Sequence, residues 1–209
     1  MSVGAYYDAM ACGYDALVAT VKYIGPAWLD RMLPSIPPPI RAADFGCANG
    51  GLGQIVRRHF PAVHLTGFDV SEEMIKQARL SDAYNALYQH DLNCALPLME
   101  NASINLAIAL GFTEFLDKPL CLLGEISRLL TPGGTLLISF QEHWPDRAEL
   151  APRIIRGDVL THRAYSVGEI TDFLTAHAFT IEGLESITGY VGSRTGFAFP
   201  YSMVRAKRT

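Results

Sequence analysis

Short apolar runs alternate with helix-like segments through the middle of the chain, and this alternation restricts the fold more than any other feature of the sequence. Apolar residues recur at helical spacing between most of the runs, as at Leu52, Ile55 and Val56. The strand-like runs themselves fall at residues 40–45, 63–68, 86–89, 104–110 and 135–140. Alternation of this kind predicts an α/β fold, with a mostly parallel sheet and helices on both of its faces.

The C-terminal part of the chain departs from this alternation. Ser166 and Glu169 form a capping-box pattern that opens a helix. Two strand-like stretches follow, near residues 180–186 and 196–206, and no helix pattern separates them. Adjacent strands that lack a crossover helix are antiparallel. We therefore expect a seven-stranded, mostly parallel sheet that ends in an antiparallel C-terminal hairpin.

The length of 209 residues suits one domain with a real core. The one break in composition is PSIPPP at residues 34–39, where three consecutive prolines cannot continue a helix. We interpret residues 1–39 as a helical segment, at about 4–33, followed by this connector, both within the same domain. Residues 40–209 then form the main α/β unit.

Charge and cysteine content exclude several classes of protein. The formal net charge of −4 gives no general attraction to nucleic acid. No stretch approaches the roughly 20 apolar residues that span a bilayer, and the N-terminus lacks a secretory signal pattern. The cysteines show no C-x-x-C pair or metal-ligand spacing, and they are Cys12, Cys47, Cys94 and Cys121. We expect a cytoplasmic protein without a metal, membrane or nucleic-acid partner; oligomeric state stays open.

The strongest local signal is DFGCANG at residues 44–50, which lies directly after the first strand and before a helix. Small residues at positions 46, 48 and 50 allow a sharp turn and a close approach of backbone to a ligand. The N-terminus of the following helix offers unpaired N–H donors to a carboxylate or phosphate. A tight strand-to-helix turn with no ligand is the alternative interpretation.

Two further carboxylates follow the next two strands. Asp69 comes 19 residues after Gly50, where an acidic residue can accept the hydroxyl protons of a ribose. Asp91 follows the third strand and can accept from the amino group of an adenine. Each residue alone is compatible with an ordinary turn aspartate. Together with the small-residue turn they indicate a cofactor that contains a nucleoside.

These segments resemble the motifs of class I S-adenosylmethionine-dependent methyltransferases. DFGCANG is similar to motif I, usually D/E-x-G-x-G-x-G; GFDVSEEMIKQAR and HDLN resemble motifs II and III, and EISRLLTPGGTLLIS resembles the later motifs. The resemblance runs from about residue 40 to 140. The C-terminal SVGEITDFLTAHAFTIEGLESITGY and the N-terminal YYDAMACGYDALV are also similar to segments of small-molecule members. The resemblance implies methyl transfer from S-adenosylmethionine to a small-molecule acceptor.

For the methionine part of that cofactor, the resemblance implies the following contacts. Asp44, directly or through an ordered water, would help to fix the amino group. Leu110 would offer backbone to the same group, and Tyr14 would close over the cofactor. The loop beside the methionine part comprises Gly46, Cys47, Ala48 and Gly50. Ala48 replaces the usual middle glycine, and a positive φ at this position would count against cofactor binding.

For the nucleoside part, the resemblance assigns the ribose hydroxyls to Asp69. Val70 and Met74 would lie against the adenine. Asp91 and Leu92 would contact the adenine edge.

The acceptor is not chosen by the fold. A general base is needed only if the acceptor loses a proton, and His143, after the fifth strand, is the best candidate on pKa grounds. A histidine on a surface loop is the alternative. Tyr6, Tyr7, Tyr165 and Tyr190 could line an aromatic acceptor pocket or serve in packing.

Three other functions stay open at this point. A nicotinamide-dependent oxidoreductase shares the turn and the later acidic residue, but its G-x-G-x-x-G fingerprint is not matched. A non-catalytic protein could keep the cofactor pocket as a binding or partner-regulating module. An aminopropyl transferase of the same fold is disfavoured, because no acidic polyamine-site motif is evident.

Overall fold

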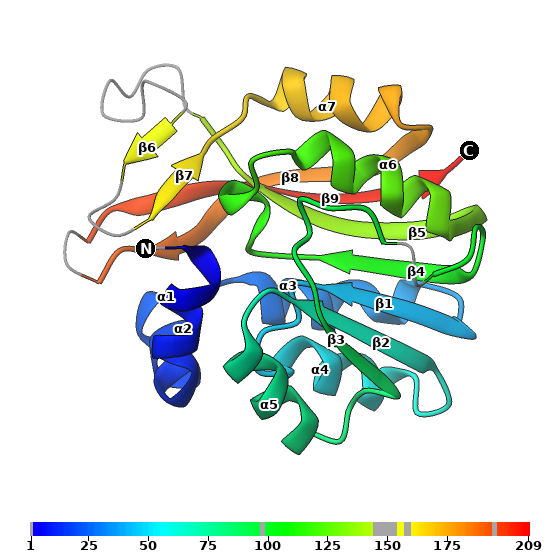
Figure 1. Cartoon of the computed structure of the whole chain (residues 1–209). Coiled ribbons are helices and arrows are strands. Elements are labelled where there is room, and N and C mark those ends of the chain that lie inside the picture. The colour runs from blue at the N-terminus through cyan, green and yellow to red at the C-terminus, as the bar shows by residue number, and fades with distance from the viewer. Residues whose placement is uncertain (1, 97–98, 144–153, 157–159, 194–195) are drawn as a thin grey trace.

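The computed structural model describes residues 2–96, 99–143, 154–156, 160–193 and 196–209 (Figure 1). Seven strands form one sheet in the order β3-β2-β1-β4-β5-β9-β8. They are β1 Arg41–Phe45, β2 His64–Asp69, β3 Ala86–Gln89, β4 Ile104–Ala109, β5 Leu130–Gln141, β8 Phe179–Val191 and β9 Ala198–Arg208. A separate pair comprises β6 Ile154–Arg156 and β7 Thr161–Arg163.

Strands β1 to β5 pair in parallel, and β9 is antiparallel to both β5 and β8. The predicted seven-stranded sheet with an antiparallel C-terminal hairpin is therefore confirmed. The hairpin is longer than expected, since its pairing extends from Phe179 opposite Arg208 to Val191 opposite Ala198.

Strand β5 also begins earlier than predicted. The sequence predicts this strand at residues 135–140, yet Leu130 already pairs with Ile104. The register shifts between Ile104 and Leu106, and Gly133 has a φ of +76°. A glycine at positive φ lets a strand bulge without ending, so β5 continues through this irregularity.

Helices cover both faces of the sheet (Figure 1). Their bounds are α1 Val3–Met10, α2 Tyr14–Val21, α3 Gly25–Met32, α4 Gly51–His59, α5 Glu72–Leu80, α6 Pro119–Leu129 and α7 Val167–Ala176. Short 3-10 helices are η1 Ala11–Gly13, η2 Leu33–Ser35 and η3 Thr113–Phe115. The N-terminal segment is thus helical, as expected, but broken into several pieces.

The core has one cluster on each face of the sheet. The cluster under α6 and α7 includes Ile126 and Ile170, and the cluster under α3 and α4 includes Trp28 and Val56. Alternate residues of the strands supply the two clusters, because successive side chains of a strand point to opposite faces. The strand ends and the turns that follow them are left free to form a site.

Two helices begin at capping side chains, and the predicted capping box at Ser166 and Glu169 is confirmed. Ser71 Oγ accepts the Met74 N–H at 3.1 Å at the start of α5, and Ser166 and Glu169 form a complete capping box at the start of α7. None of the helices in the described part of the chain has the length and apolar character that crossing a bilayer requires.

Candidate functional site

A cavity of about 960 Å³ lies at the carboxyl ends of β1, β2, β3 and β4. Its walls come from the residues after these strands, from α1, and from the segments around η3 and β7. Open α/β sheets bind ligands at this edge, and the volume is within the usual range for small-molecule sites.

Most of the residues that the sequence assigned to a cofactor line this cavity. They are Tyr14, Gly46, Ala48, Asp69, Val70, Met74, Asp91, Leu92 and Leu110. A second hollow of about 130 Å³ shares four of them, namely Tyr14, Gly46, Ala48 and Leu110, and adds Cys47. The two hollows therefore meet at the turn after β1.

The turn after β1 has an unusual backbone. Gly46 has a φ of +72°, and a Cβ there would lie 2.5 Å from the Phe112 ring, so the position requires glycine. Ala48 has a φ of +45°, the conformation that the sequence argument took to oppose cofactor binding. Its N–H donates to Asp69 Oδ2 at 2.9 Å, which helps to hold the left-handed conformation. Alanine therefore occupies the glycine-like position at a cost of about 1–2 kcal/mol.

Asp69 both holds this turn and faces the cavity. Besides the Ala48 N–H, its carboxylate accepts the Ser71 N–H at 2.9 Å through Oδ1. Burial raises the pKa of Asp69, and the backbone hydrogen bonds oppose that rise. Each carboxylate oxygen has a second lone pair, so Asp69 can accept from a ligand without releasing the turn.

Asp44 does not line the cavity, and its contact with the cofactor's amino group stays a prediction. It is still a strand residue, so its side chain points to a face of the sheet, where the Tyr84 hydroxyl donates to Oδ2 at 2.6 Å. Oδ1 is buried and has no hydrogen-bond partner among the described residues. Burial raises the pKa of Asp44 to about 7. A contact through an ordered water stays a prediction.

Gly50 also lies outside the cavity lining. Its φ is +96°, and a Cβ there would lie 2.7 Å from Ser81 Oγ. Glycine at this position therefore allows α4 to start close to the end of α5. Its place in a loop beside the cofactor stays a prediction.

Asp91 is exposed at the rim of the cavity. Its Oδ1 accepts from both the backbone N–H and the side-chain amide of Asn93, at 2.9 and 3.0 Å. Gln89, which sequence reasoning missed, also lines the cavity and donates to the Val70 carbonyl at 3.2 Å. These residues form the polar edge of the wall beyond β3.

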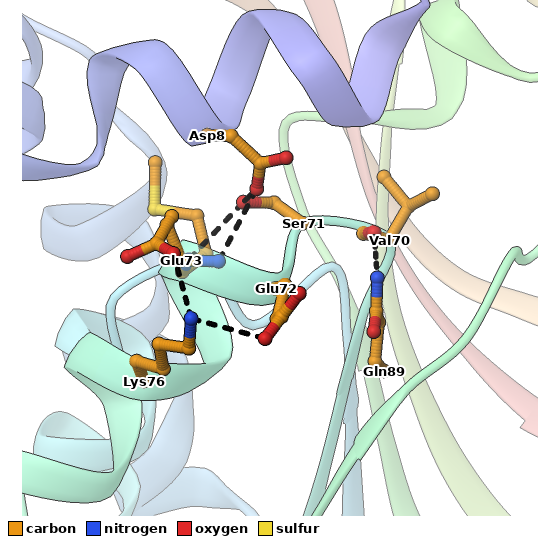
Figure 2. Close-up of polar contacts among 8 residues, drawn as sticks. Asp8, Val70, Ser71, Glu72, Glu73, Lys76 and Gln89 are labelled. Carbon is orange, nitrogen blue, oxygen red and sulfur yellow. Dashed lines mark hydrogen bonds and ion pairs between the residues drawn. The ribbon is translucent and has the colours of Figure 1, made fainter.

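Helix α1 forms one wall of the cavity, and it contributes an aspartate, Asp8, that was not among the predicted site residues. Asp8 lines the cavity, and its Oδ1 accepts from Ser71 Oγ at 2.6 Å and from the Glu73 N–H at 3.2 Å (Figure 2). The Ser71 hydrogen bond is the main cause of the lowered pKa of Asp8. The sequence signal for Asp8 was the tyrosine-aspartate pattern of residues 6–8. That pattern predicts no role for Asp8, because the role depends on Ser71, which lies beside it only in the folded chain.

A different part of the cavity is largely apolar. Phe112, Phe115, Leu116 and Leu160 line it together with Tyr7. Burial raises the pKa of Tyr7, which keeps its hydroxyl neutral. These side chains can exclude water from a bound molecule.

The other tyrosines proposed for an aromatic pocket do not line the cavity. Tyr165 contacts Phe140 and Phe173 edge to face, and Tyr190 stacks on Phe199 with ring centroids 4.5 Å apart. Tyr6 lies outside the lining as well. Packing is therefore their observed role.

The base candidate His143 also lies outside the cavity lining, and its backbone N–H donates to the Tyr165 carbonyl. A buried acid, Glu114, lies in η3 between two cavity residues and accepts a hydrogen bond from the Tyr201 hydroxyl. Burial raises the pKa of Glu114 to about 7. The described residues contain no cluster of three or more potential metal ligands.

The chain is similar in sequence to a methyltransferase family model and to curated enzymes that include methyltransferases. Residues 43–136 match the family model described as a methyltransferase domain. The chain is 36% identical over 145 residues to carboxy-S-adenosyl-L-methionine synthase of Aeromonas salmonicida, covering 64% of this chain and 54% of that protein. It is 28% identical over 194 residues to malonyl-[acyl-carrier protein] O-methyltransferase of Methylococcus capsulatus, covering 89% and 68%.

Among solved structures, an S-adenosylmethionine-dependent methyltransferase from Mesorhizobium loti superposes with a TM-score of 0.71 at 21% identity, covering 87% of this chain and 96% of that one. This likeness shows the fold. The chain spans only about half the length of several curated relatives, including the synthase.

Proposed function

We propose that this chain is an S-adenosylmethionine-dependent methyltransferase with a small-molecule acceptor, because residues 43–136 match a methyltransferase-domain model and the chain shares the fold of a solved methyltransferase. The observation that carries the proposal is the placement of Asp69 and Asp91 with the small-residue turn around one cavity at the strand ends. The names of the relatives support a small or carrier-bound acceptor.

The cavity residues suit this cofactor. Asp69 would take the ribose hydroxyls, and Val70, Met74 and Leu92 offer apolar surface for the adenine beside Asp91. The smaller hollow beside Gly46, Cys47 and Ala48 would take the methionine part, with Leu110 and Tyr14 on its other sides. Carboxylates predominate among the charged residues of the lining, which favours a cofactor that bears a positive sulfur.

When bound, the cofactor supplies a methyl group already activated by the positive sulfur. The residues of the chain are then required to position the acceptor and exclude water. Phe112, Phe115 and Leu116 supply an apolar wall for this purpose. No histidine lines the cavity in the part of the chain that the structure describes, so we assign catalysis to positioning and desolvation rather than to His143.

We also propose a cytoplasmic location, and the cysteines support it. Cys12, Cys47, Cys94 and Cys121 are all free thiols. Free thiols persist in a reducing compartment. We further propose that the protein acts on neither nucleic acid nor a membrane surface, on the basis of its net charge of −4.

An acceptor screen tests the proposal. Purified protein is incubated with S-adenosylmethionine and a broad set of small metabolites, and S-adenosylhomocysteine formation is measured by mass spectrometry. Transfer to at least one small molecule is expected. Binding of the cofactor with no transfer to metabolites or to protein extracts would favour the non-catalytic binding module instead.

A further inference from the structure

Arg163, at the end of β7, is the single cationic side chain among the described residues that line the cavity. Its Nη1 donates to the Leu116 carbonyl at 2.8 Å, and its Nη2 donates to Asp117 Oδ1 at 2.9 Å. These contacts hold the guanidinium on the wall formed by β7 and the segment after η3. Asp69 and the turn after β1 belong to a different wall.

The charged partner of Arg163 is held weakly. The side chain of Asp117 is 75% exposed, whereas that of Arg163 is 28% exposed. Ion pairs with such an exposed partner contribute about 0–1 kcal/mol. The guanidinium can therefore exchange Asp117 for another carboxylate at small cost.

The other carboxylates that line the cavity accept hydrogen bonds from groups other than Arg163. Asp69 accepts from backbone N–H groups, Asp8 accepts from Ser71 and Glu73, and Asp91 accepts from Asn93. Among the described contacts, Arg163 uses two of the five N–H donors of a guanidinium. Donors thus remain for a ligand.

The surroundings of Arg163 strengthen an interaction with an anion. Phe115, Leu116 and Leu160 line the same part of the cavity, and charge–charge attraction is stronger where apolar side chains exclude water. A guanidinium binds a carboxylate through two parallel hydrogen bonds, a geometry that a lysine does not offer.

We infer that the methyl acceptor carries a carboxylate and that Arg163 binds it. The inference rests on the proposed function and adds the acceptor's chemical class. A singly charged carboxylate fits better than a phosphate dianion, because several aspartates line the cavity and Arg163 is the single cation among its described lining residues. Arg163 would thus act as a specificity-determining residue that anchors the acceptor.

The test uses the full chain saturated with S-adenosylhomocysteine. A panel of small aryl and alkyl monocarboxylates is titrated by calorimetry, each beside its neutral primary amide and its phosphonate analogue. We expect the best carboxylate to bind at least about fivefold more tightly than its amide and its phosphonate.

Two variants should then shift carboxylate binding in opposite directions. Arg163→Gln is expected to weaken it about tenfold, with affinity for S-adenosylhomocysteine within twofold of wild type. Asp117→Asn removes the competing carboxylate and is expected to strengthen it about threefold. A purely structural role for Arg163 predicts no gain in Asp117→Asn. Melting temperatures of both variants establish that they fold.

Several results would overturn the inference. These are equal binding of acids and amides, tighter binding of phosphonates, no binding of any acid, or unchanged acid binding in Arg163→Gln. A tenfold loss of S-adenosylhomocysteine affinity in that variant would instead assign Arg163 to the cofactor. The proposed function fails separately, if the wild-type chain does not bind S-adenosylhomocysteine at all.

Discussion

Asp8 Oδ1 accepts a hydrogen bond from Ser71 Oγ at 2.6 Å, and this contact ties α1 to the start of α5 (Figure 2). Ser71 is also the N-cap of α5 and donates its backbone N–H to Asp69. The first helix, the cap of α5 and the proposed ribose-binding carboxylate therefore form one connected set of hydrogen bonds. The position of α1 over the cavity depends on that set.

Replacing Asp8 by Ala should loosen α1 and weaken cofactor binding. The change removes a charged acceptor from Ser71 Oγ and the Glu73 N–H. Because Asp8 is partly exposed, we expect a loss of about 1 kcal/mol, or about fivefold in affinity for S-adenosylhomocysteine. Hydrogen–deuterium exchange should rise in residues 3–10. Asp172→Asn, an exposed site on α7, is the control; equal exchange in both variants would contradict the role assigned to Asp8.

Replacing Ala48 by Gly should stabilise the protein and keep cofactor binding. The left-handed φ of +45° strains alanine, and relief of that strain outweighs the greater flexibility of glycine in the unfolded chain, for a net gain of up to ~1 kcal/mol. Ala178→Gly is a matched control, because Ala178 has a φ of +61° outside the cavity. Urea unfolding should show a gain for both; a marked loss of stability in Ala48→Gly alone would refute the strain at this position.

The buried carboxyl of Asp44 should make the apoprotein less stable as the pH rises. Burial raises its folded pKa to about 7, while the unfolded value is near 4, so the folded state holds the extra proton between these values. Its stabilising effect is complete below about pH 4 and is lost as the pH rises through about 7.

Between pH 5 and 8, the unfolding free energy of wild type should therefore fall relative to that of Asp44→Asn, by on the order of 2 kcal/mol. Glu114, with a pKa also raised to about 7, remains in both proteins and cancels in the comparison. Chemical unfolding at several pH values measures the difference. Parallel pH profiles of the two proteins would show that Asp44 ionises normally.

The sheet could be predicted because its signals are local. Apolar runs that alternate with helical spacing predict the mostly parallel sheet. No helix pattern separates residues 180–186 from 196–206, and this predicts the final antiparallel hairpin. The positions of Asp69 and Asp91 followed for the same reason, since each comes directly after a strand and the ends of parallel strands meet at one edge.

The parts that could not be predicted depend on contacts between distant segments. Asp44 accepts a hydrogen bond from Tyr84, forty residues later, and no local pattern identifies this partner. The role of Asp8 requires Ser71 as a neighbour. Arg163 lies in a stretch of weak periodicity, so the strand that carries it could not be inferred from a local pattern.

Calorimetric titration with S-adenosylhomocysteine tests the central claim most directly. Wild-type protein should bind it and should not bind NADH tightly. Asp69→Asn keeps the side-chain volume and one oxygen but loses the charge, so it should bind at least about fivefold more weakly, a loss of ~1 kcal/mol or more. The absence of binding to wild type, unchanged affinity in Asp69→Asn, or tight binding of NADH alone would contradict the account.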